Sequence, residues 1–260
     1  MLPVALLSGG LAVRMRPDTI RLPKSMLTAA GKPFIEHQLN LLREKGASRI
    51  ILCLGYLGEM IEQFVGDGSR FGLSVSYSYD GEKLLGTGGA LEKAARGIDG
   101  PFFVLYGDSY LDVDYAKIAE AFHRSGAGYK GLMTVYRNEG RWDSSNVVFE
   151  GGEIVRYSKR RRGGDMKYID YGLGILSAQV FEEFGRGCSL YEYAPSQREY
   201  APPQPERDSY ADSTAFDLAD VYEKLAEQRL LLGYEVFNRF YEIGSTEGLK
   251  EFEQMIASRS

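Results

Sequence analysis

The sequence predicts an α/β protein with three layers, in which helices cover both faces of a mostly parallel mixed sheet. Short apolar runs of strand length alternate with amphipathic segments of helical length through the first half of the chain. Because parallel strands need crossover helices between them, this alternation indicates such a sheet. The length of 260 residues and the hydrophobic content of 44% suffice for a large domain with a substantial core.

The first half begins with a buried strand over residues 3–7, followed by a loop and a helix over 33–45. Ile35, Leu39 and Leu42 recur on one face of that helix. Further along, strands are expected over 49–54, 73–79 and 102–106, and helices over 59–65, 88–96 and 114–124, the last capped by Asp114.

The second half is richer in strands. Gly151 and Gly152 stand between two of them and predict a hairpin turn. A helix over 216–227 is expected to begin through Ser213 or Thr214. The other expected elements are strands over 131–136, 145–149, 153–159, 169–176, 230–236 and 241–243, and helices over 179–184 and 246–257.

No internal repeat divides the chain, so residues 1–260 are expected to form one domain. The Pro- and Tyr-rich stretch over 187–213 is long for a connection and predicts a loop or lid.

The composition excludes several classes of protein. A net charge of −5 argues against a nucleic-acid-binding protein, and no apolar run approaches the length of a membrane span. The two cysteines are too few for a disulfide framework, and Cys53 is expected in the core. Residues 1–7 lack the basic leader of a signal peptide, so a cytoplasmic location is expected. His37 and His123 lie in expected helices without a partner motif for nucleophilic catalysis.

The loop after the first strand carries the strongest chemical signal. Gly9 and Gly10 allow backbone N–H groups to approach a polyanion, and Arg14 and Lys24 add positive charge. Neither the P-loop nor the dinucleotide-binding pattern is present. An ordinary turn with two solvated cations is the alternative interpretation.

The residue types and their spacing decide between these interpretations. Gly-Gly-x-x-x-Arg-Met-x-Pro over 9–17, followed by Pro-Lys-Ser-Met over 23–26, resembles the signature of the sugar-1-phosphate nucleotidylyltransferases. The resemblance implies the nucleotide-diphospho-sugar transferase fold, which is Rossmann-like. It also implies that Arg14 holds the β- and γ-phosphates and that Lys24 neutralises the α-phosphate and the incoming phosphate. The backbone implied to bind the nucleotide comprises Leu7, Ser8, Gly9 and Gly10.

A glycine-rich segment over 84–91 precedes the helix expected at 88–96, and exposed N–H groups at a helix start suit a phosphate or a base edge. A flexible turn is the alternative. The segment resembles the Leu-Gly-Thr-Ala/Gly-Gly motif of the same family. That resemblance implies nucleotide contacts from Leu85, Gly86, Thr87 and Gly88, with Gly86 facing the base and Gly88 leaving room for the nucleotide.

Two acidic residues are candidates for a metal site. Asp108 directly follows a buried strand, where ligands of α/β proteins bind, although it could instead cap the next turn. Glu242 lies in an apolar strand, where a carboxylate needs a partner. The family resemblance makes Asp108 a metal ligand and nucleotide contact and places the second metal ligand at Glu242, where the family has Asp. The implied cofactor is Mg²⁺.

Four further residues are candidates for the sugar phosphate: Asn146, Lys159, Asp170 and Gly172. Lys159 supplies a cation, Asp170 and Asn146 can bind hydroxyls, and Gly172 lies against the sugar ring in the resembling family. Each could also be an ordinary strand residue. The basic run over 159–162 is either a solvated turn or a site for a second anion.

The resemblance implies a Mg²⁺-dependent enzyme that transfers a nucleoside monophosphate from a nucleoside triphosphate to a sugar 1-phosphate, releasing pyrophosphate. Residues 1–125 would form the nucleotide-binding half and 126–260 the sugar-phosphate-binding half. Within the family, the chain most resembles the short mannose-, heptose- and glucose-1-phosphate enzymes, guanylyltransferases among them. Two alternatives are a cytidylyltransferase for a phosphorylated alcohol and a catalytically silent subunit that binds nucleotide sugar. The expected partners are the two substrates, with neither nucleic acid nor membrane, and self-association is left open.

Overall fold

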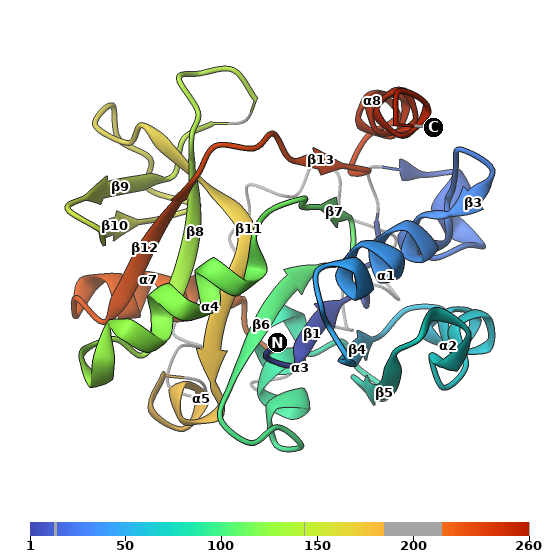
Figure 1. Ribbon diagram of the computed structural model, residues 1–260, viewed down its shortest axis with the longest axis horizontal. Helices are drawn as coiled ribbons and strands as arrows, with labels where there is room; N and C mark the ends of the chain where they lie inside the picture. The colour runs from blue at the N-terminus through green and yellow to red at the C-terminus, as the bar shows by residue number, and fades with distance from the viewer. Residues whose placement is uncertain (13–14, 143, 185–214, 260) are drawn as a thin grey trace.

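A nine-stranded sheet forms the middle layer of the computed structural model, which describes residues 1–12, 15–142, 144–184 and 215–259 (Figure 1). The strand order is β5-β4-β1-β6-β11-β8-β12-β10-β9, so both halves of the chain contribute to one sheet. The strands are β1 (Val4–Leu7), β4 (Arg49–Leu54), β5 (Ser74–Tyr79), β6 (Pro101–Tyr106), β8 (Gly131–Arg137), β9 (Val147–Glu150), β10 (Glu153–Tyr157), β11 (Tyr168–Ser177) and β12 (Leu231–Val236).

The sheet changes character between its two ends. The first-half strands β5, β4, β1 and β6 pair in parallel, as the alternation of elements predicts. Strand β11 then runs antiparallel to both β6 and β8, and β9 and β10 form an antiparallel hairpin. Gly151 and Gly152 form its turn with φ of +58° and +89°, which confirms the predicted hairpin.

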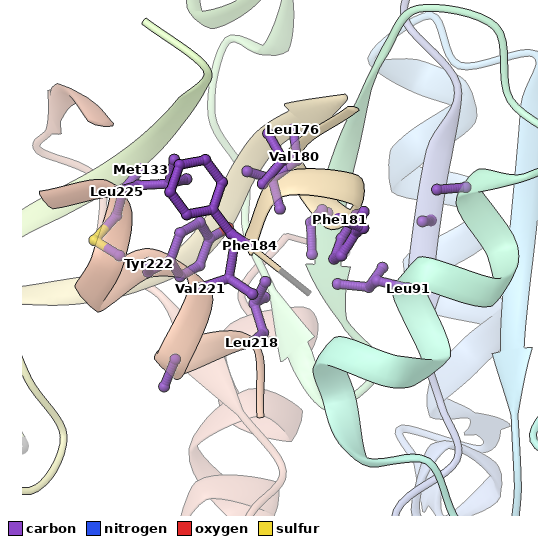
Figure 2. Close-up of a cluster of buried hydrophobic side chains, with 14 of the residues drawn as sticks. Leu91, Met133, Leu176, Val180, Phe181, Phe184, Leu218, Val221, Tyr222 and Leu225 are labelled. Atoms are coloured by element: carbon purple, nitrogen blue, oxygen red, sulfur yellow. The ribbon is translucent and has the colours of Figure 1, made fainter. Parts of the chain in front are cut away.

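Helices cover both faces of the sheet. On one face α1 (Phe34–Glu44), α2 (Gly58–Val65) and α4 (Tyr115–Arg124) pack against the sheet. On the other face α3 (Gly86–Ala95), α5 (Ala178–Phe184) and α7 (Leu218–Glu227) do the same. Figure 2 shows this second core, in which Phe184 of α5 lies beside Val221 and Tyr222 of α7, and Phe181 of α5 lies toward Leu91 of α3.

A third, smaller core joins α8 (Thr246–Ala257) to α1. Phe252 of α8 packs edge-on against Phe34 and His37. Two pairs of short strands, β2 (Thr28–Ala29) with β3 (Lys32–Pro33) and β7 (Ser109–Tyr110) with β13 (Tyr241–Glu242), lie at this end (Figure 1).

Most predicted elements are confirmed, with differences at their ends. Strand β4 and helix α8 have the predicted bounds, and the carboxylate of Asp114 caps α4 by accepting a hydrogen bond from the N–H of Lys117 at 3.0 Å. The predicted start of the helix at 216–227 is wrong, because α7 begins at Leu218 with Asp217 as its N-cap. Ser213 and Thr214 lie outside the described residues, as do the predicted loop over 187–213 and Cys188.

Other predicted bounds shift by one or two residues. The strand expected over 145–149 begins at Val147, and the one expected over 153–159 ends at Tyr157. Strand β13 matches the strand expected over 241–243, whereas β2, β3 and β7 were not predicted, because such short segments carry no periodicity. Among the described helices, none is both long and apolar enough to cross a bilayer.

Candidate active site

A cavity of about 190 Å³ opens where β1, β4, β5 and β6 end. The carboxyl ends of parallel strands are the usual ligand-binding edge of such a sheet. Several residues predicted to bind the nucleotide line this cavity: Leu7, Ser8, Gly9, Gly10, Lys24, Gly86, Thr87 and Asp108. Arg14, the other predicted catalytic residue, lies outside the described residues.

Glycines bring the strand ends into close contact around the cavity. A Cβ atom on Gly9 would lie 2.8 Å from the nitrogen of Gly55, and one on Gly107 would lie 2.3 Å from Oγ of Ser8. Within the described ranges, no backbone hydrogen bond uses the N–H groups of Gly9 or Gly10. These donors are therefore available to an anion, as the glycine pair predicts.

Lys24 and Asp108 form an ion pair beside the cavity. The Lys24 ammonium lies 2.8 Å from Oδ2 of Asp108, and both side chains are partly exposed. A partly buried pair of opposite charges holds both groups in defined positions. Lys24 begins a short 3₁₀ helix, Lys24–Met26, after the loop that carries the predicted anion site.

Sequence reasoning missed the residue that supports the Asp108 turn. Gln38 of α1 is buried, and its Nε2 donates to the carbonyls of Tyr106 at 3.0 Å and Ser109 at 2.7 Å. These two hydrogen bonds bridge the turn that carries Asp108. Polarity at one position of an amphipathic helix was the available signal, but it does not reveal the partner.

Short strands bring Glu242 next to Asp108. In the β7–β13 pair Glu242 lies opposite Ser109, and the N–H of Ile243 donates to the carbonyl of Asp108 at 3.0 Å. Oγ of Ser109 lies 3.4 Å from Oε1 of Glu242. The expectation that Glu242 lies in an apolar strand interior is wrong, because the residue is exposed at this short edge.

The two carboxylates fit a magnesium ion. Their oxygens are the ligand type that Mg²⁺ prefers, and at phosphate sites this ion takes one or two protein carboxylates. The described residues contain no cluster of three or more His, Cys, Asp or Glu side chains for a metal cage. The donor set of Asp108 and Glu242 matches that ligand preference, and their role as metal ligands stays a prediction.

The start of α3 contacts both the cavity and Phe216. Gly86 and Thr87 line the cavity, whereas Leu85 and Gly88 pair with Phe216. The N–H of Gly88 donates to the carbonyl of Phe216 at 2.9 Å, and a Cβ atom on Gly88 would lie 2.3 Å from the Phe216 ring. Phe216 thus packs directly against Gly88, and the nucleotide contact of Gly88 stays a prediction.

Asp80 is a cavity-lining carboxylate that sequence reasoning missed. Burial raises its pKa to about 6, although the N–H of Leu85 and the charge of Lys93 favour ionisation. Its Oδ2 accepts the Leu85 N–H at 3.2 Å. Asp80 directly follows β5, as Asp108 follows β6, so the strand-end rule that singled out Asp108 would also have found it. Burial of the Cys53 thiol, together with the negative charge of Asp80, raises the pKa of this thiol to about 12, which makes this free cysteine unreactive.

The predicted sugar-phosphate residues gather around Tyr106 at the other side of the site. The Lys159 ammonium lies 5.8 Å from the centroid of the Tyr106 ring, which itself lines the cavity. Burial raises the pKa of Tyr106 well above its ordinary value, and the charges of Asp170, Asp217, Asp108 and Glu242 add to the shift. The hydroxyl of Tyr106 therefore stays neutral at neutral pH.

Asp170 and Gly172 form an irregularity in β11. The register with β8 shifts between Asp170 and Gly174, and Gly172 has a φ of +93° that favours glycine. Oδ1 of Asp170 accepts the Gly172 N–H at 3.0 Å, and Oδ1 of Asn146 accepts the Asp170 N–H at 2.9 Å. Burial raises the pKa of Asp170, although the Gly172 N–H, Lys159 and Tyr157 favour its ionised form.

The basic run after β10 pairs with α7. Arg160 lies 3.3 Å from Asp220, and Arg161 lies 2.9 Å from Glu223. Both arginines are exposed in a bend, as the solvated-turn interpretation predicts, and each also pairs with an acidic residue of α7.

Comparison with known proteins assigns this site to a family. The family model described as nucleotidyl transferase matches residues 4–144, which include the glycine loop, Lys24, residues 84–91 and Asp108. The chain belongs to the nucleotidyl transferase family.

Several curated relatives of the chain are named as sugar-1-phosphate nucleotidyltransferases. The chain is 30% identical to a UTP–glucose-1-phosphate uridylyltransferase of Synechocystis over 75% of this chain and 51% of the relative. It is 36% identical to a mannose-1-phosphate guanyltransferase of Gibberella zeae over 68% of this chain and 50% of the relative. The chain spans about half the length of the curated relatives it matches.

Solved structures of other proteins share the fold over nearly the whole chain. HddC from Yersinia pseudotuberculosis is 22% identical and superposes with a TM-score of 0.71, covering 98% of this chain and 100% of that one. A UDP-glucose pyrophosphorylase complexed with UDP-glucose is 16% identical with a TM-score of 0.74 and full coverage of both chains. At these identities the likeness establishes the nucleotide-diphospho-sugar transferase fold.

Proposed function

We propose that this nucleotidyl transferase converts a nucleoside triphosphate and a sugar 1-phosphate into a nucleoside diphosphate sugar and pyrophosphate. The observation that carries the proposal is the cavity in which the Gly9–Gly10 loop, the Lys24–Asp108 pair and the start of α3 meet. Lys24 lines the cavity, and the Lys159 ammonium lies 5.8 Å from the ring of Tyr106, which also lines it, so two cations lie at the cavity.

The proposed reaction needs no covalent intermediate with the protein. A phosphate oxygen of the sugar 1-phosphate attacks the α-phosphorus, and the bond from that phosphorus to the oxygen bridging the α- and β-phosphates breaks. Pyrophosphate leaves with the electron pair of the broken bond. Catalysis then consists of alignment and charge neutralisation, which suits a site of N–H donors and ammonium groups.

Each group in the site has a proposed role. The N–H groups of Gly9 and Gly10 and the side chain of Arg14 bind the β- and γ-phosphates, and Lys24 neutralises the α-phosphate. Lys159 binds the phosphate of the sugar, and Asp170, Asn146 and Gly172 surround its ring. Asp108 and Glu242 would hold Mg²⁺, which supplies positive charge to the phosphates.

The named relatives suggest which substrates to test first. Several are mannose-1-phosphate guanylyltransferases, and the Synechocystis relative is a glucose-1-phosphate uridylyltransferase. We propose GTP with mannose 1-phosphate as the first pair and UTP with glucose 1-phosphate as the second.

A pyrophosphate-release assay tests the proposal. The purified protein is incubated with Mg²⁺ and each of GTP, UTP, CTP and dTTP. The second substrate is mannose 1-phosphate, glucose 1-phosphate or a phosphorylated alcohol, and the product is identified by mass spectrometry. Product from one pair supports the proposal. Turnover only with CTP and a phosphorylated alcohol would identify the other transferase class. Binding of nucleotide sugar without turnover of any pair would identify a silent subunit.

A further inference from the structure

Three acidic residues of α7 pair with three consecutive basic residues after β10. Asp217, Asp220 and Glu223 are spaced by three, so they lie along one side of the helix start. The Lys159 ammonium lies 3.5 Å from Asp217. The other two ion pairs join Arg160 to Asp220 and Arg161 to Glu223. These three ion pairs attach the segment after β10, residues 159–161, to the start of α7.

The Lys159–Asp217 pair differs from the other two pairs because Asp217 also contacts residues 85–88 at the start of α3, here called the nucleotide loop. Its Oδ1 accepts the hydroxyl of Thr87 at 2.9 Å and the N–H of Ala219 at 2.9 Å. Oγ1 of Thr87 in turn accepts the N–H of Leu218 at 2.9 Å. Thr87 lines the cavity, so one carboxylate contacts a cavity residue and the Lys159 ammonium.

Backbone bonds reinforce this junction. The N–H of Phe216 donates to the carbonyl of Leu85 at 3.1 Å, and the carbonyl of Phe216 accepts the N–H of Gly88 at 2.9 Å. Residues 216–217 therefore lie along the loop at the start of α3 on both sides of Thr87.

Asp217 carries its negative charge at neutral pH. Burial alone would raise its pKa, but the Lys159 ammonium and the hydrogen bonds from Ala219 and Thr87 lower the pKa below its ordinary value. An ionised carboxylate held by two hydrogen bonds gives Lys159 a fixed counter-charge. A cation that is held in place loses less conformational freedom when a phosphate binds.

We propose that Asp217 is a positioning residue that holds the Lys159 ammonium in a fixed position relative to the nucleotide loop, so that the bound sugar phosphate lies in the correct position to react with the nucleotide. This inference rests on the proposed function, and it adds a residue that touches neither substrate. It also gives the contacts between α3 and α7 a role in catalysis, because they connect the two substrate subsites.

Two substitutions separate positioning from helix capping. Asp217→Asn keeps a good N-cap oxygen but removes the charge, whereas Asp217→Glu keeps the charge and is a poorer cap. We expect Asp217→Asn to raise the KM for sugar 1-phosphate about tenfold and to leave the KM for the triphosphate within about twofold. Asp217→Glu should keep the sugar-phosphate KM within about threefold while lowering the melting temperature. The opposite pattern, a neutral Asn variant and an impaired Glu variant, would show capping alone and overturn the proposal.

A double-mutant cycle provides the second test. In a Lys159→Met background, Asp217→Asn should have no further effect on the sugar-phosphate KM, because the interaction it removes is already absent. Additive effects would contradict the proposal. Asp220→Asn removes the neighbouring ion pair and serves as the matched control, with an expected KM within about twofold of the parent protein.

The wild-type assay distinguishes a failure of the positioning role from a failure of the proposed function. If the wild-type protein forms product and Asp217→Asn behaves like it, only the positioning role fails. If the wild-type protein forms product with no triphosphate and sugar 1-phosphate pair, the proposed function fails and the positioning role fails with it.

Discussion

Two carboxylates at strand ends line the cavity of the proposed active site. Asp80 follows β5, and Asp108 follows β6, so both reach the same edge of the sheet. Their surroundings differ, because Asp108 has the Lys24 ammonium at 2.8 Å and Asp80 has a single backbone donor with burial raising its pKa. Similar residues in similar positions are thus suited to different tasks.

Replacing Lys24 tests the electrostatic part of the site. Lys24→Ala should lower kcat by about 10²–10³, which is the scale of losing one preorganised charged group. The free energy of unfolding should change by less than about 1 kcal/mol, since a partly exposed ion pair contributes little. Steady-state kinetics with Lys32→Ala, an exposed lysine paired with Glu36, provide the control. A kcat for Lys24→Ala equal to that of the control would refute the assignment.

The metal ligands are tested by Mg²⁺ titration of activity. Asp108→Asn and Glu242→Gln should each raise the Mg²⁺ concentration needed for half-maximal rate, because each removes an anionic oxygen ligand. Glu242→Asp keeps the charge and should retain measurable activity. An unchanged Mg²⁺ requirement in Glu242→Gln would make Glu242 structural.

Asp80 predicts a pH dependence of stability. Its pKa is about 6 in the folded protein, so the folded state binds this proton more tightly than the unfolded state. The destabilisation from ionised Asp80 is therefore absent below about pH 4, grows up to about pH 6 and is complete above it. After discounting partial exposure, we expect Asp80→Asn to be more stable than the wild type by about 1 kcal/mol at pH 7.5 and equally stable at pH 4.

Denaturant titrations at both pH values measure this difference. Asp99→Asn changes an exposed carboxylate and is the control. The same stability gain at pH 4 and pH 7.5 would show that Asp80 does not ionise as expected.

At the scale of elements, helices fix the turns that carry the site. Helix α1 supports the Asp108 turn through Gln38, and α7 supports the start of α3 through Asp217. Both contacts join segments far apart in the chain. The helices therefore position active groups as well as covering the sheet.

Gln38→Leu tests the support from α1. The substitution leaves the carbonyls of Tyr106 and Ser109 without their buried donor, so we expect a loss of about 1–3 kcal/mol in the free energy of unfolding. The Mg²⁺ requirement should also rise, because the turn carrying Asp108 loses its support. Leu42→Met on the same buried face should cost less than about 1.5 kcal/mol and leave the Mg²⁺ requirement unchanged. An unchanged Mg²⁺ requirement in Gln38→Leu would show that Gln38 only stabilises the fold.

At the scale of the whole molecule, one sheet joins the two halves of the site. Strand β11 pairs with β6 of the first half and β8 of the second, and its Gly172 lies beside Tyr106 and Ser109. Substrates bound on both sides of this junction should stabilise the domain as a unit.

A thermal-shift measurement tests whether nucleotide binding stabilises the domain. Mg²⁺ with the correct triphosphate at about a hundred times its Kd should add about 2.7 kcal/mol, which corresponds to roughly 5–10 °C for a chain of this length. Inosine without phosphates serves as the control and should give no shift. The absence of any shift with all four triphosphates would contradict the nucleotide site.

The sequence by itself determined the order of helices and strands, the cavity loops and the family. These features are local: periodicity selects each element, and a strand followed by glycines, Lys24 or Asp108 can be recognised from neighbouring residues. Only the tertiary structure decided that Glu242 lies beside Asp108, that Phe216 fills the space at Gly88 and that Gln38 and Asp217 hold the site together. Each of these depends on a contact between distant segments, and no local pattern in the chain encodes which distant partner a side chain meets.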